Sequence, residues 1–150
     1  MEAITWSLKK FDELTGLEMY EILKLRSEVF VVEQNCVFLD MDDRDQLAFH
    51  LQGRINEVLA AVVRILPPGL AYTEPSIGRV VSSPLFRRQG VGIELMNNAI
   101  KETLALYGLC AIKIGAQEYL KKFYESFGFI QCSETYLEDD IPHIKMIRNQ

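Results

Sequence analysis

The residues best suited to chemistry lie near the middle of the chain, where Arg87 and Arg88 precede two closely spaced glycines, Gly90 and Gly92. Because glycine lacks a Cβ, a ligand can approach the main chain closely at these positions. A helical pattern starts directly after them, and the first turn of a helix offers free N–H groups and the positive end of its dipole. This arrangement predicts a binding site for a phosphate-bearing ligand.

Two common phosphate-binding loops do not fit this segment. A Walker loop needs a Lys followed by Ser or Thr after its last glycine, and neither occurs here. A dinucleotide-binding loop needs a third glycine, and Leu95 holds that position. The remaining pattern, Arg87-x-x-Gly90-x-Gly92, resembles the Arg/Gln-x-x-Gly-x-Gly/Ala signature of the GCN5-related N-acetyltransferases (GNAT). For the loop alone, a basic turn capped by glycines is the alternative.

A second segment adds to this resemblance. In the family, an Asn at the end of a strand is followed by a Tyr and then by a Gly-Phe pair at fixed spacings. Gln117, Tyr124, Gly128 and Phe129 stand at those spacings, with Gln in place of Asn. Two motifs in the right order are far more specific than either one.

The resemblance extends over nearly the whole chain. Residues 25–36 and 138–146 are similar to those of the ElaA-type branch of the superfamily, as are Ile77-Gly-Arg-Val80 and Ala116-Gln117. One departure is that Asp42-Asp43 stands where an Asp-Gly pair is expected, so that turn can differ in shape.

The resemblance implies an N-acetyltransferase that uses acetyl-coenzyme A (acetyl-CoA) as its acyl donor. The loop would bind the pyrophosphate through Arg87, Arg88, Gln89, Gly90, Val91 and Gly92. Val80 and Val81 would hold the pantetheine through their main chain, with Val81 N–H as the donor to the thioester carbonyl. Gln117 and Phe123 would lie near the thiol end. The alternatives are a non-catalytic domain that binds or senses acyl-CoA, and a purely structural domain.

Direct attack of an amine on the thioester requires a proton for the departing thiolate. The family spacing makes Tyr124 the predicted proton donor, because a phenol stays protonated at neutral pH and can still give its proton to a stronger base. The alternative is a structural tyrosine that packs beside Phe123 and Phe127. Tyr119 is a weaker rival.

The same reaction requires a group that accepts the proton of the amine. We predict Glu33 in this role, since its segment borders the acceptor groove in the superfamily. The other candidates are Asp42, Glu138 and His143. His50 and His143 rank below Glu33, because a lone histidine is more often a hydrogen-bonded structural residue than a catalyst. For each acidic residue, a solvated loop charge is the alternative. Cys36 and Cys110 could carry an acyl group only with a neighbouring base, and the sequence identifies none.

The composition predicts one globular domain over residues 1–150, in which 49% of the residues are hydrophobic. The formal charge is −5 and no basic run occurs, which argues against a nucleic-acid partner. No stretch is apolar enough to span a bilayer, and the first residues do not read as a signal peptide. We therefore expect a cytoplasmic protein whose acceptor is a small-molecule or peptide amine.

Three widely spaced cysteines predict reduced thiols, with neither a disulfide nor a zinc site. No metal ion is expected in the reaction.

The elements around these residues predict an α/β fold. We expect strands at 4–11, 47–51, 58–66, 77–82, 109–116, 129–136 and 143–148. We expect helices after the Thr15–Glu18 capping box, at 93–107 and at 118–127. The strand–helix–strand crossover from Ile77 to Ala116 implies parallel pairing at the centre of a mixed, twisted sheet with helices on both faces. The exposed edges of such a sheet favour a homodimer.

Overall fold

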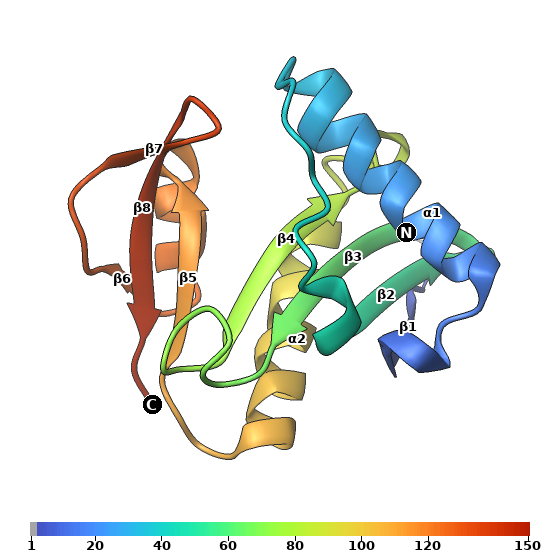
Figure 1. The fold of residues 1–150 in the computed structure, drawn as a ribbon. Helices are drawn as coiled ribbons and strands as arrows, with labels where there is room; N and C mark the ends of the chain where they lie inside the picture. Colours follow the sequence, from blue (N-terminus) through green and yellow to red (C-terminus); the bar gives the residue numbers. More distant parts are fainter. Residues whose placement is uncertain (1–2) are drawn as a thin grey trace.

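The computed structural model describes residues 3–150 and divides their strands between two sheets, which are set side by side (Figure 1). The first sheet has the order β1-β2-β3-β4, formed by Thr5–Lys10, Phe49–Ile55, Val58–Leu66 and Ser76–Ser82. In the second sheet, β8 (Ile141–Arg148) pairs with β5 (Ile112–Gln117), β6 (Phe129–Gln131) and β7 (Tyr136–Glu138). Every pairing within each sheet is antiparallel.

The longer helices cover opposite faces of the first sheet. They are α1 (Gly16–Arg26), which continues as a π-helix over Ser27–Glu33, and α2 (Val91–Tyr107). The second sheet carries the short α3 (Lys121–Glu125), which follows a 3-10 turn at Glu118–Leu120. Further 3-10 turns lie at Phe11–Glu13, Asp45–Leu47 and Pro84–Phe86. Within the described residues, no helix has both the length and the apolar character needed to cross a membrane.

The predicted capping box at the start of α1 is confirmed. The hydroxyl of Thr15 accepts from Glu18 N–H at 3.1 Å, and Thr15 N–H donates to the Glu18 carboxylate at 2.9 Å. These two bonds satisfy donors that the first turn of a helix would otherwise leave without a partner.

The alternation of side chains along β3 explains why both faces are covered. Ala61, Val63 and Ile65 pack into the core that α2 closes, whereas Val62 packs with α1. A register shift against β2 that skips Ala60 places Leu59 on the α1 side as well. A central strand with two buried faces therefore positions both helices. The predicted helix-flanked α/β fold is confirmed.

The centre of the fold differs from a continuous mixed sheet. β4 and β5 run in the same direction, as predicted, and a hydrogen bond from Lys113 N–H to the Pro75 carbonyl (3.1 Å) joins their starts (Figure 1). Beyond that bond, the described strands belong to separate sheets. The register of β4 against β3 shifts between Val62 and Arg64, and Arg79 adopts a φ of +50°. This is a β-bulge, which bends a strand and breaks its pairing.

Two details concern the ends of strands. The turn between β2 and β3 lies at Asn56-Glu57, where both φ angles are positive. Gly53 lies inside β2, where a Cβ would come within 2.5 Å of the Trp6 ring, so the glycine makes room for that ring. The strand predicted from residue 109 begins at Ile112.

Candidate active site

A cavity of about 240 Å³ lies where β4 and β5 separate. Its walls come from β4, β5, the π-helix, the segment after it, the α3 region and the β7–β8 hairpin. Among the predicted site residues, it is lined by Val80, Val81, Arg87, Gln117 and Tyr124. The fold thus brings residues from both sequence motifs to one cavity.

The glycine loop forms a second, open hollow that adjoins the first, since Ser82 and Arg87 line both. Gly90 caps α2 with a φ of +77°, a conformation that favours glycine. A Cβ on Gly92 would meet only the Phe123 ring, at an ordinary 3.8 Å. The protein's own packing therefore does not require glycine at residue 92, and the free space fits a loop that admits a ligand to its main chain.

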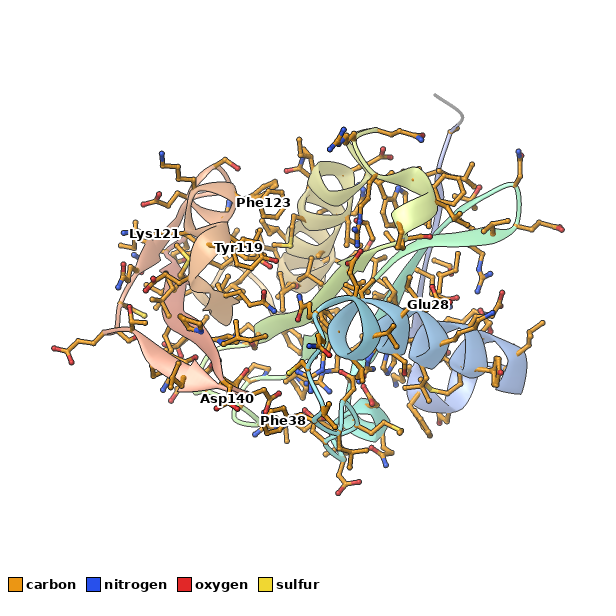
Figure 2. The ribbon with its side chains drawn as sticks, turned by 90° about the horizontal axis from the view of Figure 1, so that it is seen from above. Glu28, Phe38, Tyr119, Lys121, Phe123 and Asp140 are labelled. Atoms are coloured by element: carbon orange, nitrogen blue, oxygen red, sulfur yellow. The ribbon has the colours of Figure 1, made fainter. Side chains whose placement is uncertain are left out.

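Phe123 lies beside this loop and not at the far end of the cavity. It reaches from α3 toward the start of α2 (Figure 2), and it lines the loop hollow together with Arg88, Val91 and Gly92. Gln89 is exposed and lines neither hollow. The pyrophosphate contact predicted for Gln89 is thus less favoured than that of its neighbours.

On β4, Val80 and Val81 border the cavity. Ser83 N–H, at the end of the strand, donates to the Ala60 carbonyl of β3 at 2.7 Å. Since donors alternate along an antiparallel strand, Val81 N–H faces β3 and Ser82 N–H faces the cleft. This orientation argues against Val81 N–H as the donor to a bound carbonyl.

The position of Tyr124 is compatible with both of its predicted roles, a proton donor at the cavity and a tyrosine that packs in the core. Its side chain is buried in the core, edge-on to Phe123 and Phe129 at centroid distances of 5.2 and 6.1 Å, and it also lines the cavity. Burial raises the pKa of this phenol, so it keeps its proton. Tyr119 also lines the cavity but is 73% exposed.

Glu33, the predicted base, lies in a different arrangement. Both its carboxylate oxygens accept hydrogen bonds from the Arg87 guanidinium at 2.5 Å, and both side chains are 42% exposed. Hydrogen bonding from Arg87 lowers the pKa of Glu33, and Glu33 does not line the cavity. A carboxylate in this position is a poor proton acceptor for an amine in the cleft.

The residue after Glu33 does reach the cavity. The side-chain amides of Gln34 and Gln117 exchange hydrogen bonds at 3.3 and 3.4 Å. Gln117 thus ends β5 in contact with the end of the π-helix. This contact joins two segments that lie 83 residues apart in the sequence.

Asp42 and His50 belong to a buried ion network and line neither hollow. Arg26 pairs with Asp40 and Asp45 at 2.7 Å, and Arg64 pairs with Asp42 at 2.7 Å. Arg79, at the bulge, pairs with Asp40 at 2.8 Å, and the ring Nε2 of His50 contacts the Asp45 carbonyl at 2.9 Å. The network ties residues 40–45 to α1, β3 and β4.

The structure also distinguishes Cys36 from Cys110, the two cysteines considered as acyl carriers. Cys110 lines neither hollow, whereas Cys36 lines the main cavity and its thiol donates to the Asp139 carbonyl at 3.4 Å. Burial and the charges of Asp139 and Asp140 raise the pKa of Cys36. A thiol in these surroundings forms little thiolate, which disfavours it as an acyl-carrying nucleophile.

Comparison with known proteins decides the family. A family model described as "Acetyltransferase (GNAT) domain" matches residues 31–149. The chain belongs to the GNAT acetyltransferases. Protein ElaA of Escherichia coli strain K12 is 40% identical over 147 residues, which cover 97% of this chain and 96% of ElaA. The crystal structure of E. coli ElaA matches with a TM-score of 0.91 and 38% identity, covering 98% of this chain and 100% of that chain.

A crystal structure of an acyl-CoA N-acyltransferase from Pseudomonas aeruginosa is similarly close. It matches with a TM-score of 0.93 and 40% identity, covering 97% of this chain and 99% of that chain. A GNAT family acetyltransferase from Elizabethkingia anophelis with acetyl-CoA bound shares the fold at 14% identity and a TM-score of 0.67, covering 98% of each chain. These findings confirm the ElaA-type resemblance and the prediction of an N-acetyltransferase.

Proposed function

We propose that this GNAT protein transfers the acetyl group of acetyl-CoA directly to a primary amine, in the cavity between β4 and β5. The observation that carries the proposal is the continuity of two hollows. The hollow of the glycine loop lies on one side of Ser82 and Arg87, and the main cavity with Tyr124 lies on the other. Diphosphate and thioester, which the pantetheine arm separates in acetyl-CoA, would each meet a hollow of matching chemistry.

The loop residues would hold the diphosphate. The N–H groups at the start of α2, from Val91 onward, and the side chains of Arg87 and Arg88 supply donors and positive charge. Gly92 lets the phosphate oxygens approach the helix. The cleft-facing N–H groups of β4 would bond the pantetheine amides and polarise the thioester carbonyl.

In the transfer step, the amine nitrogen bonds to the carbonyl carbon and the bond from that carbon to sulfur breaks. Tyr124 gives its proton to the departing sulfur, because its buried phenol is protonated and borders the cavity. An ammonium acceptor loses two protons in all. One goes to a base, and the other replaces the proton of Tyr124 through water.

Direct attack is preferred to a covalent acyl-enzyme. That route needs a thiolate, and the raised pKa of Cys36 disfavours one. The acceptor is a small-molecule or peptide amine, in keeping with the size of the cavity.

Calorimetry with acetyl-CoA tests the binding half of the proposal. We expect wild-type protein to bind, and Gly92→Glu to lose at least about a hundredfold in affinity because its carboxylate would enter the phosphate hollow. Asn97→Glu is the matched control: it adds the same charge to an exposed position of the same helix. Equal binding by all three proteins would place the ligand elsewhere.

Release of free CoA thiol across a set of primary amines tests the catalytic half. Turnover that depends on amine concentration supports transfer. Binding of acetyl-CoA without turnover on any amine would favour the sensing domain instead.

A further inference from the structure

We propose that His143 is the general base that accepts the proton of the amine, and that Glu138 positions it and stabilises its charged form. The inference rests on the proposed acetyl transfer and names a residue for its least defined step. Both side chains line the main cavity, and they lie 3.5 Å apart between His143 Nε2 and Glu138 Oε2.

The β7–β8 hairpin fixes the tautomer of His143. Its ring Nδ1 lies 2.7 Å from the main-chain carbonyl of Ile141. A carbonyl can only accept a hydrogen bond, so Nδ1 must carry the hydrogen. In the neutral ring, the lone pair is therefore on Nε2, the nitrogen that faces Glu138. A ring held in this way can take up a proton at Nε2 without rotating.

The register of the second sheet places this base opposite the proposed acid. Ile144 and Met146 of β8 and Ile114 and Ala116 of β5 all point into the core that contains Tyr124. His143 pairs in register with Gln117, and both alternate to the other face of the sheet. An acetyl group between β4 and β5 would thus have Tyr124 on one side and His143 on the other, so that acid and base reach it from different faces of the second sheet.

Several titratable and charged groups lie around His143. Tyr136 of β7 stacks near the ring at 6.0 Å and is neutral, since burial and neighbouring groups raise its pKa to about 12. Asp40, Arg79, Cys36, Tyr119, Tyr124 and Asp139 share the cavity. Asp40 is engaged by Arg26 and Arg79. Glu138 is therefore the carboxylate that directly faces Nε2.

Glu138 also connects His143 with the solvent, to which the proton can be released. Its side chain is 56% exposed, whereas that of His143 is 9% exposed. After the amine gives one proton to Nε2 and attacks, the imidazolium is paired with Glu138 at the mouth of the cavity. The proton then leaves to water and restores the neutral ring.

The decisive variant is His143→Asn, because the Asn amide can still donate to the Ile141 carbonyl while nothing replaces Nε2. With the primary amine that wild-type protein acetylates best, we expect kcat/KM at pH 7 to fall about a hundredfold or more. Affinity for acetyl-CoA should stay within about twofold. The deficit should shrink as pH rises, because the amine then loses its proton in solution. A merely structural role would give a deficit that is independent of pH.

Two further variants sharpen the test. Glu138→Gln should lower kcat/KM less and shift the acidic limb of the pH profile to lower pH, since the imidazolium loses its carboxylate partner. Glu134→Gln makes the same change at an exposed position and should change neither quantity. His143→Asn with wild-type turnover at neutral pH would overturn the proposal.

A measurement without any acceptor separates this proposal from the proposed function. Nitrogen NMR of the two histidine rings, assigned with His50→Gln, should show neutral His143 protonated at Nδ1. A proton on Nε2 in the neutral ring would overturn the base assignment even in an active enzyme. Failure of every amine in the screen would instead remove the acetyl transfer on which the base depends.

Discussion

The two sides of the cleft are built from different parts of the chain. The loop side is formed by two glycines and two permanent cations of one local stretch, together with Phe123; its residues are Ser82, Arg87, Arg88, Gly90, Val91, Gly92 and Phe123. The β8 side, formed by Gln34, Gln117, Glu138 and His143, presents side chains from three distant segments. Binding groups of the main chain stay in place when nearby side chains are substituted, whereas binding groups of side chains change with each substitution. The loop side therefore suits a constant acyl donor, and the β8 side suits selection of an acceptor.

The two sides of the cleft also differ in what holds them in place. The loop side is fixed by α2, whose Val91, Leu95 and Met96 are buried in the main core. From Gln34 of the β8 side onward, residues 34–44 form no helix or strand, and the network from Arg26 to Arg79 holds this segment against β4. The shape of the β8 side of the cleft thus depends on buried ion pairs.

Among the variants that test this difference between the two sides, Arg26→Ala is expected to have the largest effect. The change leaves Asp45 and Asp40 buried without the guanidinium that both contact at 2.7 Å. We expect the free energy of unfolding to fall by about 3–5 kcal/mol in urea denaturation. Arg54→Ala is the control, because Arg54 pairs with Glu21 at a half-exposed site, and it should cost about 1 kcal/mol or less. Equal losses in the two variants would contradict a structural role for the network.

Tyr124→Phe is expected to have the next largest effect. Loss of the hydroxyl should lower kcat about a hundredfold while acetyl-CoA binding stays nearly constant, because the aromatic packing remains. Thiol release and calorimetry measure the two quantities. Tyr119→Phe, at an exposed ring on the same wall, should keep most of the activity. If the two variants were equally active, another group would have to protonate the sulfur.

The sequence predicted the loop side well because its parts are close together in the chain. The glycine spacing and the helical pattern after it are local, and the structure has the loop open onto α2 as expected. The capping box of α1 was predicted for the same reason. Both depend on hydrogen bonds and φ angles within a few residues.

The β8 side was harder to predict because its geometry is long-range. The prediction of Glu33 as the base followed its position in the chain. The ion pair of Glu33 with Arg87 spans 54 residues, and the tautomer of His143 depends on a tight hairpin. The split of the sheet likewise depends on the bulge at Arg79, which no local propensity indicates. A histidine three residues beyond a hairpin turn that carries acidic residues is the signal that could have been used.

A smaller effect is expected from pH on the ion network. Burial alone would raise the pKa of Asp42, but Arg64 and Arg79 lower it to about 2. A carboxylate whose pKa is lower when folded stabilises the fold above its unfolded value and loses that contribution as pH falls through the folded value. Asp42→Asn should therefore lower the melting temperature by a few degrees at pH 7, and the difference from wild type should narrow from about pH 4 toward pH 2. Asp12→Asn, at an exposed turn, should give no such convergence.

The smallest effect is expected from Glu33→Gln, and its sign separates two roles for that residue. The carboxylate of Glu33 occupies the Arg87 guanidinium with two hydrogen bonds, as a phosphate would. Acetyl-CoA must compete with it for Arg87. Because the pair is exposed, its removal should raise the affinity for acetyl-CoA only about two- to threefold, with the gain shrinking at high salt.

A base at residue 33 would give a different result. Glu33→Gln would then lower kcat by orders of magnitude and leave acetyl-CoA binding nearly unchanged. Glu28→Gln, on the exposed surface of the same π-helix, removes the same charge at a distance from Arg87 and controls for general electrostatics. Tighter binding in Glu33→Gln alone, with kcat retained, would mean that Glu33 belongs to the loop side of the cleft. A group on the β8 side would then have to accept the proton of the amine.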